Sequence, residues 1–287
     1  MLMTAKFGPA GNSKSFYDQG YSSSVDMPHW LADMGLDAYE YQCGRGVNIG
    51  QATAELLKRQ AEQFNIELSI HAPYYINLAS SDSEKIEKSI GHIIKSAQAA
   101  KWMGATRVVI HPGNVADGRE PSLKRAKIVL AEAWKRCVEE NLGDVHLCPE
   151  TMGKKNQLGD LDEVLELCLV DESFIPTIDF GHLNARELGW IKSIKEYESI
   201  LDSIENKLGS ARLKNIHCHF SRIEYTNGGE KRHWTLDDTQ FGPDFEPLAE
   251  AICRRSLSPT IICESRDVMA EDARKLKDIY LSVCKKA

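Results

Sequence analysis

Short apolar runs alternate with amphipathic segments along the whole chain. The apolar runs are rich in Ile, Val, Leu and Cys. They predict eight strands, at residues 2–7, 37–43, 66–71, 106–111, 145–150, 175–180, 213–219 and 260–264. Runs that are apolar throughout, rather than at alternate positions, are typical of parallel strands that are covered on both faces.

Amphipathic helices are predicted between these strands. Apolar residues recur at helical spacing within 84–103 and 193–208. Ser81 and Glu84 have the spacing of a capping box at the start of the first helix, and Gly209 is expected to end the second. The other helices are expected at 26–34, 50–64, 122–141, 160–169, 244–255 and 269–284.

This alternation predicts an α/β fold, a (β/α)8 TIM barrel that forms a single domain over residues 1–287. A doubly wound open sheet is the alternative. Such a sheet usually carries a glycine-rich phosphate-binding turn after its first strand, and GPAGNS after Phe7 does not match GxGxxG. Residues 221–242 form the longest stretch without a predicted element, and we expect a functional loop there.

Composition narrows the classes of partner. The formal net charge is −7, so the overall charge does not favour binding of a nucleic acid. A nucleic acid would have to be held by a local basic patch or by bound cations. The eight cysteines contain no CxxC, and we expect reduced, buried thiols in a cytoplasmic protein. No secretory signal or run of about 18 apolar residues is found, and the sequence predicts neither membrane insertion nor a protein partner.

Residues able to bind metals end successive predicted strands. One such residue at a strand end has an ordinary structural explanation, but recurrence on six strands does not. In a TIM barrel these ends converge on the active site. The candidates are His71, His111, Glu150, Asp179, His182, His217 and Glu264.

Strand parity leaves one ambiguity among these candidates. His217 and His219 are two residues apart, so both face the barrel interior in a regular strand, and either could bind a metal. Cys218 between them is expected to face the helical layer.

Mixed imidazole and carboxylate ligands suit zinc, manganese or iron. The set is larger than one tetrahedral ion uses, so we expect two or three ions, with Glu150 able to bridge two of them. Paired metals stabilise the attacking and leaving oxygens of an in-line displacement at phosphorus and lower the pKa of bound water.

Five segments of the chain resemble the endonuclease IV family, the class II apurinic/apyrimidinic endonucleases among the xylose isomerase-like barrels. They are HAPYYINLAS (71–80), VVIHPG (108–113), CPETMGK (148–154), TIDFGHLNA (177–185) and CESRD (263–267). The resemblance implies a trinuclear zinc cluster that cleaves the phosphodiester 5′ to an abasic site, with abasic DNA as the partner.

The resemblance also implies individual roles. His71 and His111 would hold the first ion, and His182 would help to hold the third. Tyr74 and Asn77 fall where the family lines its DNA-facing rim. Glu150 would bridge to a second ion, whose other ligands would be Asp179, His217 and Glu264.

The chain departs from the family at residues 230–233, which read Glu-Lys-Arg-His. The family has Asp-Arg-His there. His233 matches by position, but Lys231 takes the place of the Asp, and its ammonium would repel a cation. Glu230 could substitute if the loop shifts by one residue. The HxNDSK segment of the family is also altered. We therefore expect the third metal site to be weaker than the first two.

Two further readings remain open. A sugar isomerase or epimerase on the same barrel would use one metal held by Glu150, Asp179, the strand-7 histidine and Glu264, and would leave the other histidines surplus. A barrel that binds a ligand without catalysis is the third reading. If the protein is a phosphodiesterase that acts on DNA, basic residues in the strand-end loops would contact the DNA phosphates. These residues are Arg45, Lys154, Lys155, Arg222, Lys231 and Arg232.

Overall fold

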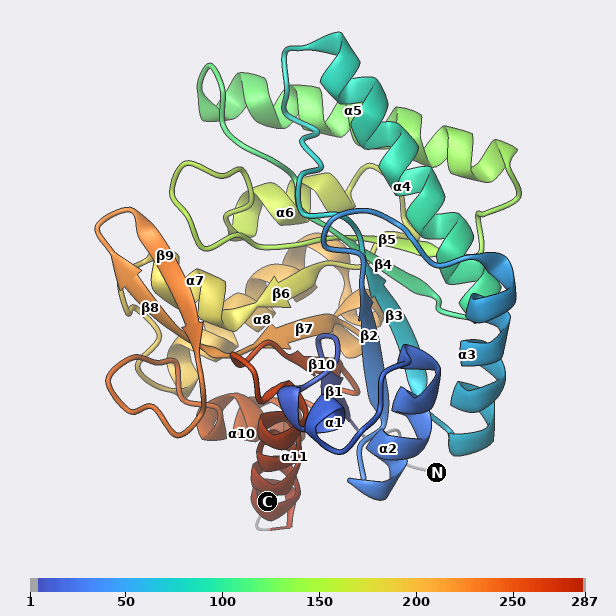
Figure 1. Ribbon diagram of the computed structural model, residues 1–287. Helices are drawn as coiled ribbons and strands as arrows, with labels where there is room; N and C mark the ends of the chain where they lie inside the picture. Colours follow the sequence, from blue (N-terminus) through green and yellow to red (C-terminus); the bar gives the residue numbers. More distant parts are fainter. Residues whose placement is uncertain (1–4, 286–287) are drawn as a thin grey trace.

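The computed structural model describes residues 5–285, which form a barrel of eight parallel strands surrounded by helices (Figure 1). Hydrogen bonding divides the strands into two sheets, ordered β2-β3-β4-β5 and β1-β10-β7-β6. Parallel bridges between Ala10 and Glu40 and between Glu150 and Thr177 join the sheets at both seams and close the barrel. The TIM-barrel prediction is confirmed.

The barrel strands are short. They are β1 (Lys6–Pro9), β2 (Ala38–Gln42), β3 (Glu67–His71), β4 (Arg107–Ile110), β5 (His146–Pro149), β6 (Thr177–Asp179), β7 (His217–Phe220) and β10 (Thr260–Cys263). The predicted first strand, 2–7, begins outside the described residues. The prediction of 213–219 was wrong at its start, because Ser210–Lys214 form a short helix, α9, before β7 begins.

All eight predicted helices are present. They are α2 (Met27–Asp33), α3 (Gln51–Phe64), α4 (Ser83–Met103), α5 (Arg119–Glu139), α6 (Leu161–Cys168), α8 (Ile194–Leu208), α10 (Glu246–Arg254) and α11 (Met269–Cys284). Besides α9, three shorter helical segments were not predicted: α1 (Lys14–Asp18), a 3-10 turn at Ser24–Asp26, and α7 (Phe180–Arg186). None of the helices in residues 5–285 is long and apolar enough to cross a membrane.

Helix ends follow side-chain chemistry. Gly209 ends α8 as expected. The capping box predicted from Ser81 was wrong by one residue, because the side chain of Asp82 accepts hydrogen bonds from the backbone N–H groups of Glu84 and Lys85. An ionised carboxylate caps the N-terminus of a helix well, since it satisfies free N–H groups and faces the positive end of the helix dipole.

Close strand packing requires a glycine in β1. A Cβ atom at Gly8 would lie 1.7 Å from the backbone oxygen of Ala38 in β2. The absence of a side chain at this position therefore allows the first two strands to approach, which brings β2 and its acidic residue Glu40 into the closed barrel.

We expect an irregular loop at residues 221–242 from the sequence, and this expectation is wrong. The segment contains an antiparallel hairpin, β8 (Arg222–Thr226) and β9 (Gly229–Trp234), which stands beside α7 (Figure 1). The sequence Asn227-Gly228 at its turn is the strongest short-range signal for a hairpin, and it could have indicated this element.

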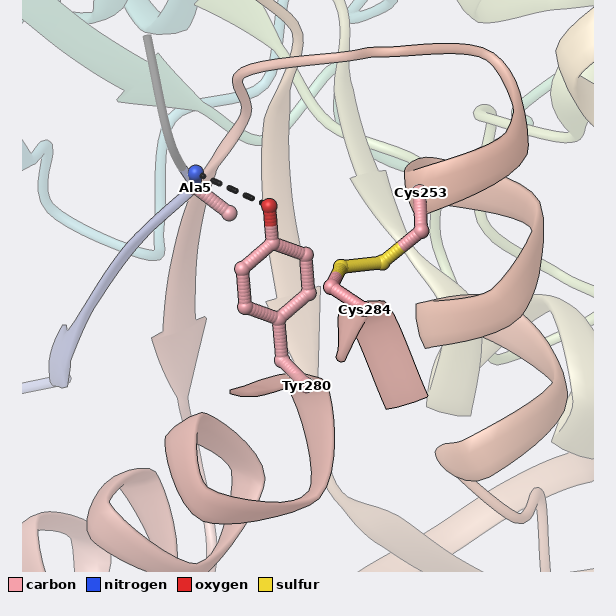
Figure 2. Close-up of a disulfide and its surroundings, with 4 residues drawn as sticks. All are labelled: Ala5, Cys253, Tyr280 and Cys284. Atoms are coloured by element: carbon pink, nitrogen blue, oxygen red, sulfur yellow. Dashed lines mark hydrogen bonds between the residues drawn. A yellow bond between two sulfur atoms is a disulfide. The ribbon is translucent and has the colours of Figure 1, made fainter. Parts of the chain in front are cut away.

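The cysteines are not all free thiols. A disulfide joins Cys253 in α10 to Cys284 at the end of α11, and Figure 2 shows it beside Tyr280, whose hydroxyl accepts a hydrogen bond from the backbone N–H of Ala5. The expectation that every cysteine is reduced was therefore wrong for this pair, because helix packing brings together two residues 31 positions apart. The other six cysteines are buried and unpaired.

Candidate metal centre

The carboxyl ends of six barrel strands bring imidazole and carboxylate groups together, as the sequence predicted. The described residues contain four groups in which one ligand atom per residue lies within 4.8 Å of the others; one of them, Glu40 with His217 and His219, lies deeper in the barrel. Site A is His71, His111 and Glu150; site B is Glu150, Asp179, His219 and Glu264; site C is His182, Glu230 and His233.

Site A is built around one carboxylate oxygen. Glu150 Oε2 lies 3.2 Å from His71 Nε2 and 3.0 Å from His111 Nε2. The other ring nitrogen of His71, Nδ1, lies 2.8 Å from the carbonyl oxygen of Ala72, to which it is placed to donate. That bond keeps the proton on Nδ1 and leaves the Nε2 lone pair directed at the site, which is how proteins orient metal-binding histidines.

Site B contains a buried carboxylate oxygen that lacks a hydrogen bond. His219 Nδ1 lies 2.9 Å from Glu150 Oε1 and 3.3 Å from Glu264 Oε1. Asp179 Oδ1 accepts a 2.6 Å hydrogen bond from the backbone N–H of His182, but within residues 5–285 its Oδ2 makes no hydrogen bond and has only the ring nitrogen Nδ1 of His182 at 3.4 Å. A buried carboxylate oxygen without a hydrogen bond is costly, and a cation in site B would satisfy it.

Site C depends on a β-bulge in the hairpin. Arg232 pairs with Glu224 and Glu230 with Tyr225, so β9 carries one extra residue, Lys231. In a regular strand Glu230 and His233, three positions apart, would face opposite sides. The bulge lets both face His182: His182 Nε2 is 3.5 Å from Glu230 Oε2, and His233 Nε2 is 3.8 Å from Glu230 Oε1.

Lys231 does not intrude on site C. Its ammonium is 2.6 Å from Glu224 Oε1, which is not a member of site C. In the structure it is the carboxylate of Glu230, not the ammonium of Lys231, that lies beside His182 and His233. Gly153 contributes to this fit, because a Cβ atom there would lie 2.6 Å from the Cβ of Glu230.

The two histidines of β7 have different surroundings. His219 belongs to site B, whereas His217 lies deeper in the barrel, with Nε2 2.9 Å from Glu40 Oε2 and Nδ1 3.3 Å from Arg107. Strand parity leaves either histidine possible as the partner of Glu150, and the family resemblance implies His217. The alternation of side chains along a strand puts both histidines in the barrel interior, so it cannot tell which one binds a metal. The two histidines differ in their depth along the barrel axis. Glu40 was missed altogether, although an acidic residue inside the apolar run AYEYQ was a usable signal.

Burial and neighbouring charges shift the pKa values of the residues in the centre in opposite directions. Burial alone would raise the pKa of Glu150, but the positive charge of His219 and the contacts of His111 hold it well below its usual range. Burial alone would lower the pKa values of His71 and His182, but the neighbouring carboxylates raise both to about 9. Burial raises the pKa of Asp179 to about 6. Without metals the centre therefore takes up protons, as expected of a pocket built for cations.

A cleft of about 290 Å³ opens above the centre, and it includes residues of all three sites. Tyr74 and Lys154 line it, and Tyr74 is 57% exposed. Arg45 and Lys155 are also exposed. Asn77 is partly buried, and its Oδ1 accepts a hydrogen bond from the backbone N–H of Asn114.

Arg222 and Arg232, like Lys231, are expected basic residues of the rim that already contact other groups of the protein. The guanidinium of Arg222 donates to the carbonyl of Phe241 and to Asp244, so it faces the hairpin base rather than the cleft. Arg232 pairs with Glu224 and stacks over the Trp234 ring at 5.2 Å, but half of its side chain stays exposed.

The chain belongs to the xylose isomerase-like TIM barrel family, whose profile matches residues 28–279. It is similar to an uncharacterized protein of Methanocaldococcus jannaschii, with 37% identity over 96% of both chains. It also resembles the protein named as a probable endonuclease 4 in Mycoplasma genitalium, with 32% identity over 69% of this chain and 66% of that one.

Solved structures of two kinds share the fold. Endonuclease IV of Thermus thermophilus superimposes with a TM-score of 0.72 over 98% of this chain and 100% of that one, at 18% identity. A D-tagatose 3-epimerase-like protein superimposes with a TM-score of 0.68 over 92% and 97%, at 20% identity. At these identities the likeness establishes the fold alone, so the chemistry has to be argued from the centre.

Proposed function

We propose that this protein is a metal-dependent phosphodiesterase, an endonuclease IV-like enzyme that cleaves DNA 5′ to abasic sites. The observation that carries the proposal is the division of nine ligand-type residues into three contiguous groups, two of which share Glu150. The donor set of nitrogen and oxygen atoms fits zinc, with manganese or iron as alternatives.

The number of sites separates this proposal from an epimerase. An epimerase of this fold would need only site B, since one divalent ion suffices to polarise a carbonyl while a side chain moves the proton. Sites A and C would then have no role, although His71 is held in a tautomer that suits a ligand and Glu230 is brought into place by a bulge. We therefore favour the reaction that uses several cations.

Charge also supports a phosphate substrate. Sites A, B and C contain four carboxylates, those of Glu150, Asp179, Glu230 and Glu264. These do not neutralise three divalent cations, so a fully loaded centre would be positive and would attract a phosphodiester in spite of the net charge of −7. Bound cations would offset the charge that develops on the attacking and leaving oxygens and would activate water.

The protein itself would position the substrate. Tyr74 stands exposed beside the cleft, and an aromatic ring there can stack on a base or fill the gap left by a missing one. Lys154 in the cleft and Arg45 and Lys155 on the surface are available to contact backbone phosphates. These contacts fix the register of the strand while the buried centre acts on one phosphodiester.

The test is cleavage of a labelled duplex with one tetrahydrofuran abasic analogue. Zinc-loaded protein should cut it on the 5′ side, leaving a 3′-hydroxyl, and an intact duplex of the same sequence should survive. Chelator treatment should abolish the cut and added zinc should restore it. No cut by fully loaded protein, together with interconversion of ketohexose epimers, would replace this proposal by the epimerase reading.

A further inference from the structure

A fully buried carboxylate lies behind site B, deeper in the barrel than the cleft. It belongs to Glu40 in β2, and it has no solvent exposure. Each of its oxygens has two polar neighbours. Oε2 lies 2.9 Å from Ser69 Oγ and 2.9 Å from His217 Nε2, and Oε1 lies 3.2 Å from Gln42 Nε2 and 3.0 Å from His219 Nε2.

The proton positions in this cluster follow from the donors around it. A guanidinium can only donate, so Arg107, 3.3 Å from His217 Nδ1, requires that this nitrogen accept. The proton of His217 therefore sits on Nε2 and is donated to Glu40. Ser69, Gln42 and His217 all donate to Glu40, so its carboxylate acts as an acceptor.

His219 links this carboxylate to the metal centre. Its Nε2 points to Glu40, and the contact is not aligned as a hydrogen bond in the structure, while its Nδ1 points to Glu150 and Glu264 in site B. We infer that Glu40 is a positioning residue for the metal centre, which accepts the Nε2 proton of His219 and so keeps Nδ1 free to bind the ion of site B.

The same geometry argues against a fourth ion between Glu40, His217 and His219, although their ligand atoms lie within 4.8 Å of one another. The Arg107 guanidinium contacts His217 and places a fixed positive charge beside that position. The role assigned to Glu40 rests on the metal-binding part of the proposed function and is independent of the substrate.

Glu40→Gln tests the inference because an amide cannot serve both histidines. Two ring N–H groups converge on Glu40, and the amide NH₂ would have to face one of them. We expect the affinity for cobalt(II), measured by titration against a chelator, to fall by about 10- to 100-fold, as for other partners of metal-binding histidines. The visible absorption bands of the bound cobalt should shift as well.

Glu67→Gln is the matched control. Glu67 lies in β3 at the opposite end of the barrel, where it contacts Lys6 and Thr260, and its amide variant should bind cobalt as the wild type does. Cobalt affinity and absorption bands unchanged in Glu40→Gln would overturn the role of Glu40 and leave the proposed function standing. Failure of the wild type to bind cobalt at all would overturn both.

A measurement on the wild type covers the case in which Glu40→Gln does not fold. In cadmium-113-loaded protein labelled with nitrogen-15 histidine, His219 should show coupling of its Nδ1 to cadmium and a proton on Nε2 shifted downfield by the carboxylate. Coupling through Nε2, or a proton on Nδ1, would contradict the inference.

Discussion

Replacing Glu150 by glutamine is expected to lower turnover by more than about 100-fold and to reduce the metal bound in sites A and B, since even the loss of a group that orients a metal ligand costs about 10- to 100-fold in affinity or activity. Glu150 supplies one oxygen to His71 and His111 in site A and the other to His219 in site B. The amide has the same shape but carries no charge and presents a donor where a cation should bind.

Glu163→Gln is a suitable control for this variant. Glu163 is also nearly buried, but it serves the capping box of α6 and pairs with Arg119, outside the three metal sites. Its variant should retain metal content and turnover. Circular dichroism of both variants would separate a loss of chemistry from a loss of fold. Wild-type turnover in Glu150→Gln would remove Glu150 from the account.

The second large effect is expected at site C. Glu230→Gln should lose about one ion per chain, and turnover should fall by at least about 10-fold, because the site then keeps only the neutral donors of His182 and His233. Lys231→Gln changes the neighbouring residue, whose ammonium pairs with Glu224 away from the site and is about half exposed. Metal content in that variant should stay at the wild-type level.

The comparison of Glu230→Gln with Lys231→Gln decides which residue of the hairpin contributes to site C. Loss of metal in Lys231→Gln but not in Glu230→Gln would mean that the bulge is placed differently and that site C is not built from Glu230. Elemental analysis of both variants, prepared in parallel with the wild type, gives the answer without a substrate.

The positions of most site residues could be predicted because the fold has a simple geometry. In a parallel barrel every strand ends on the same side, so His71, His111, Glu150, Asp179 and Glu264 could be expected to meet once each was assigned to a strand end. That expectation needed only apolar runs and the residues that follow them, and the structure brings these five together.

Three features of the site could not be predicted, because they depend on three-dimensional information that the sequence pattern does not contain. The choice between His217 and His219 needed their depth in the barrel, since parity treats them alike. The inward turn of Glu230 needed a bulge, which adds one residue to β9 without a signature in the sequence. The role of Glu40 needed closure of the barrel, which brings β2 opposite β7 and sets Glu40 against both histidines.

The central claim is that this barrel holds a centre of several metals rather than one. Zinc bound per chain, measured by inductively coupled plasma mass spectrometry after loading and removal of free metal, tests it most directly. Sites A, B and C predict about three ions per chain, with at least two retained. A single ion per chain, lost when Asp179 or Glu264 is replaced but retained in His111→Ala and His182→Ala, would contradict the account and favour a one-metal epimerase.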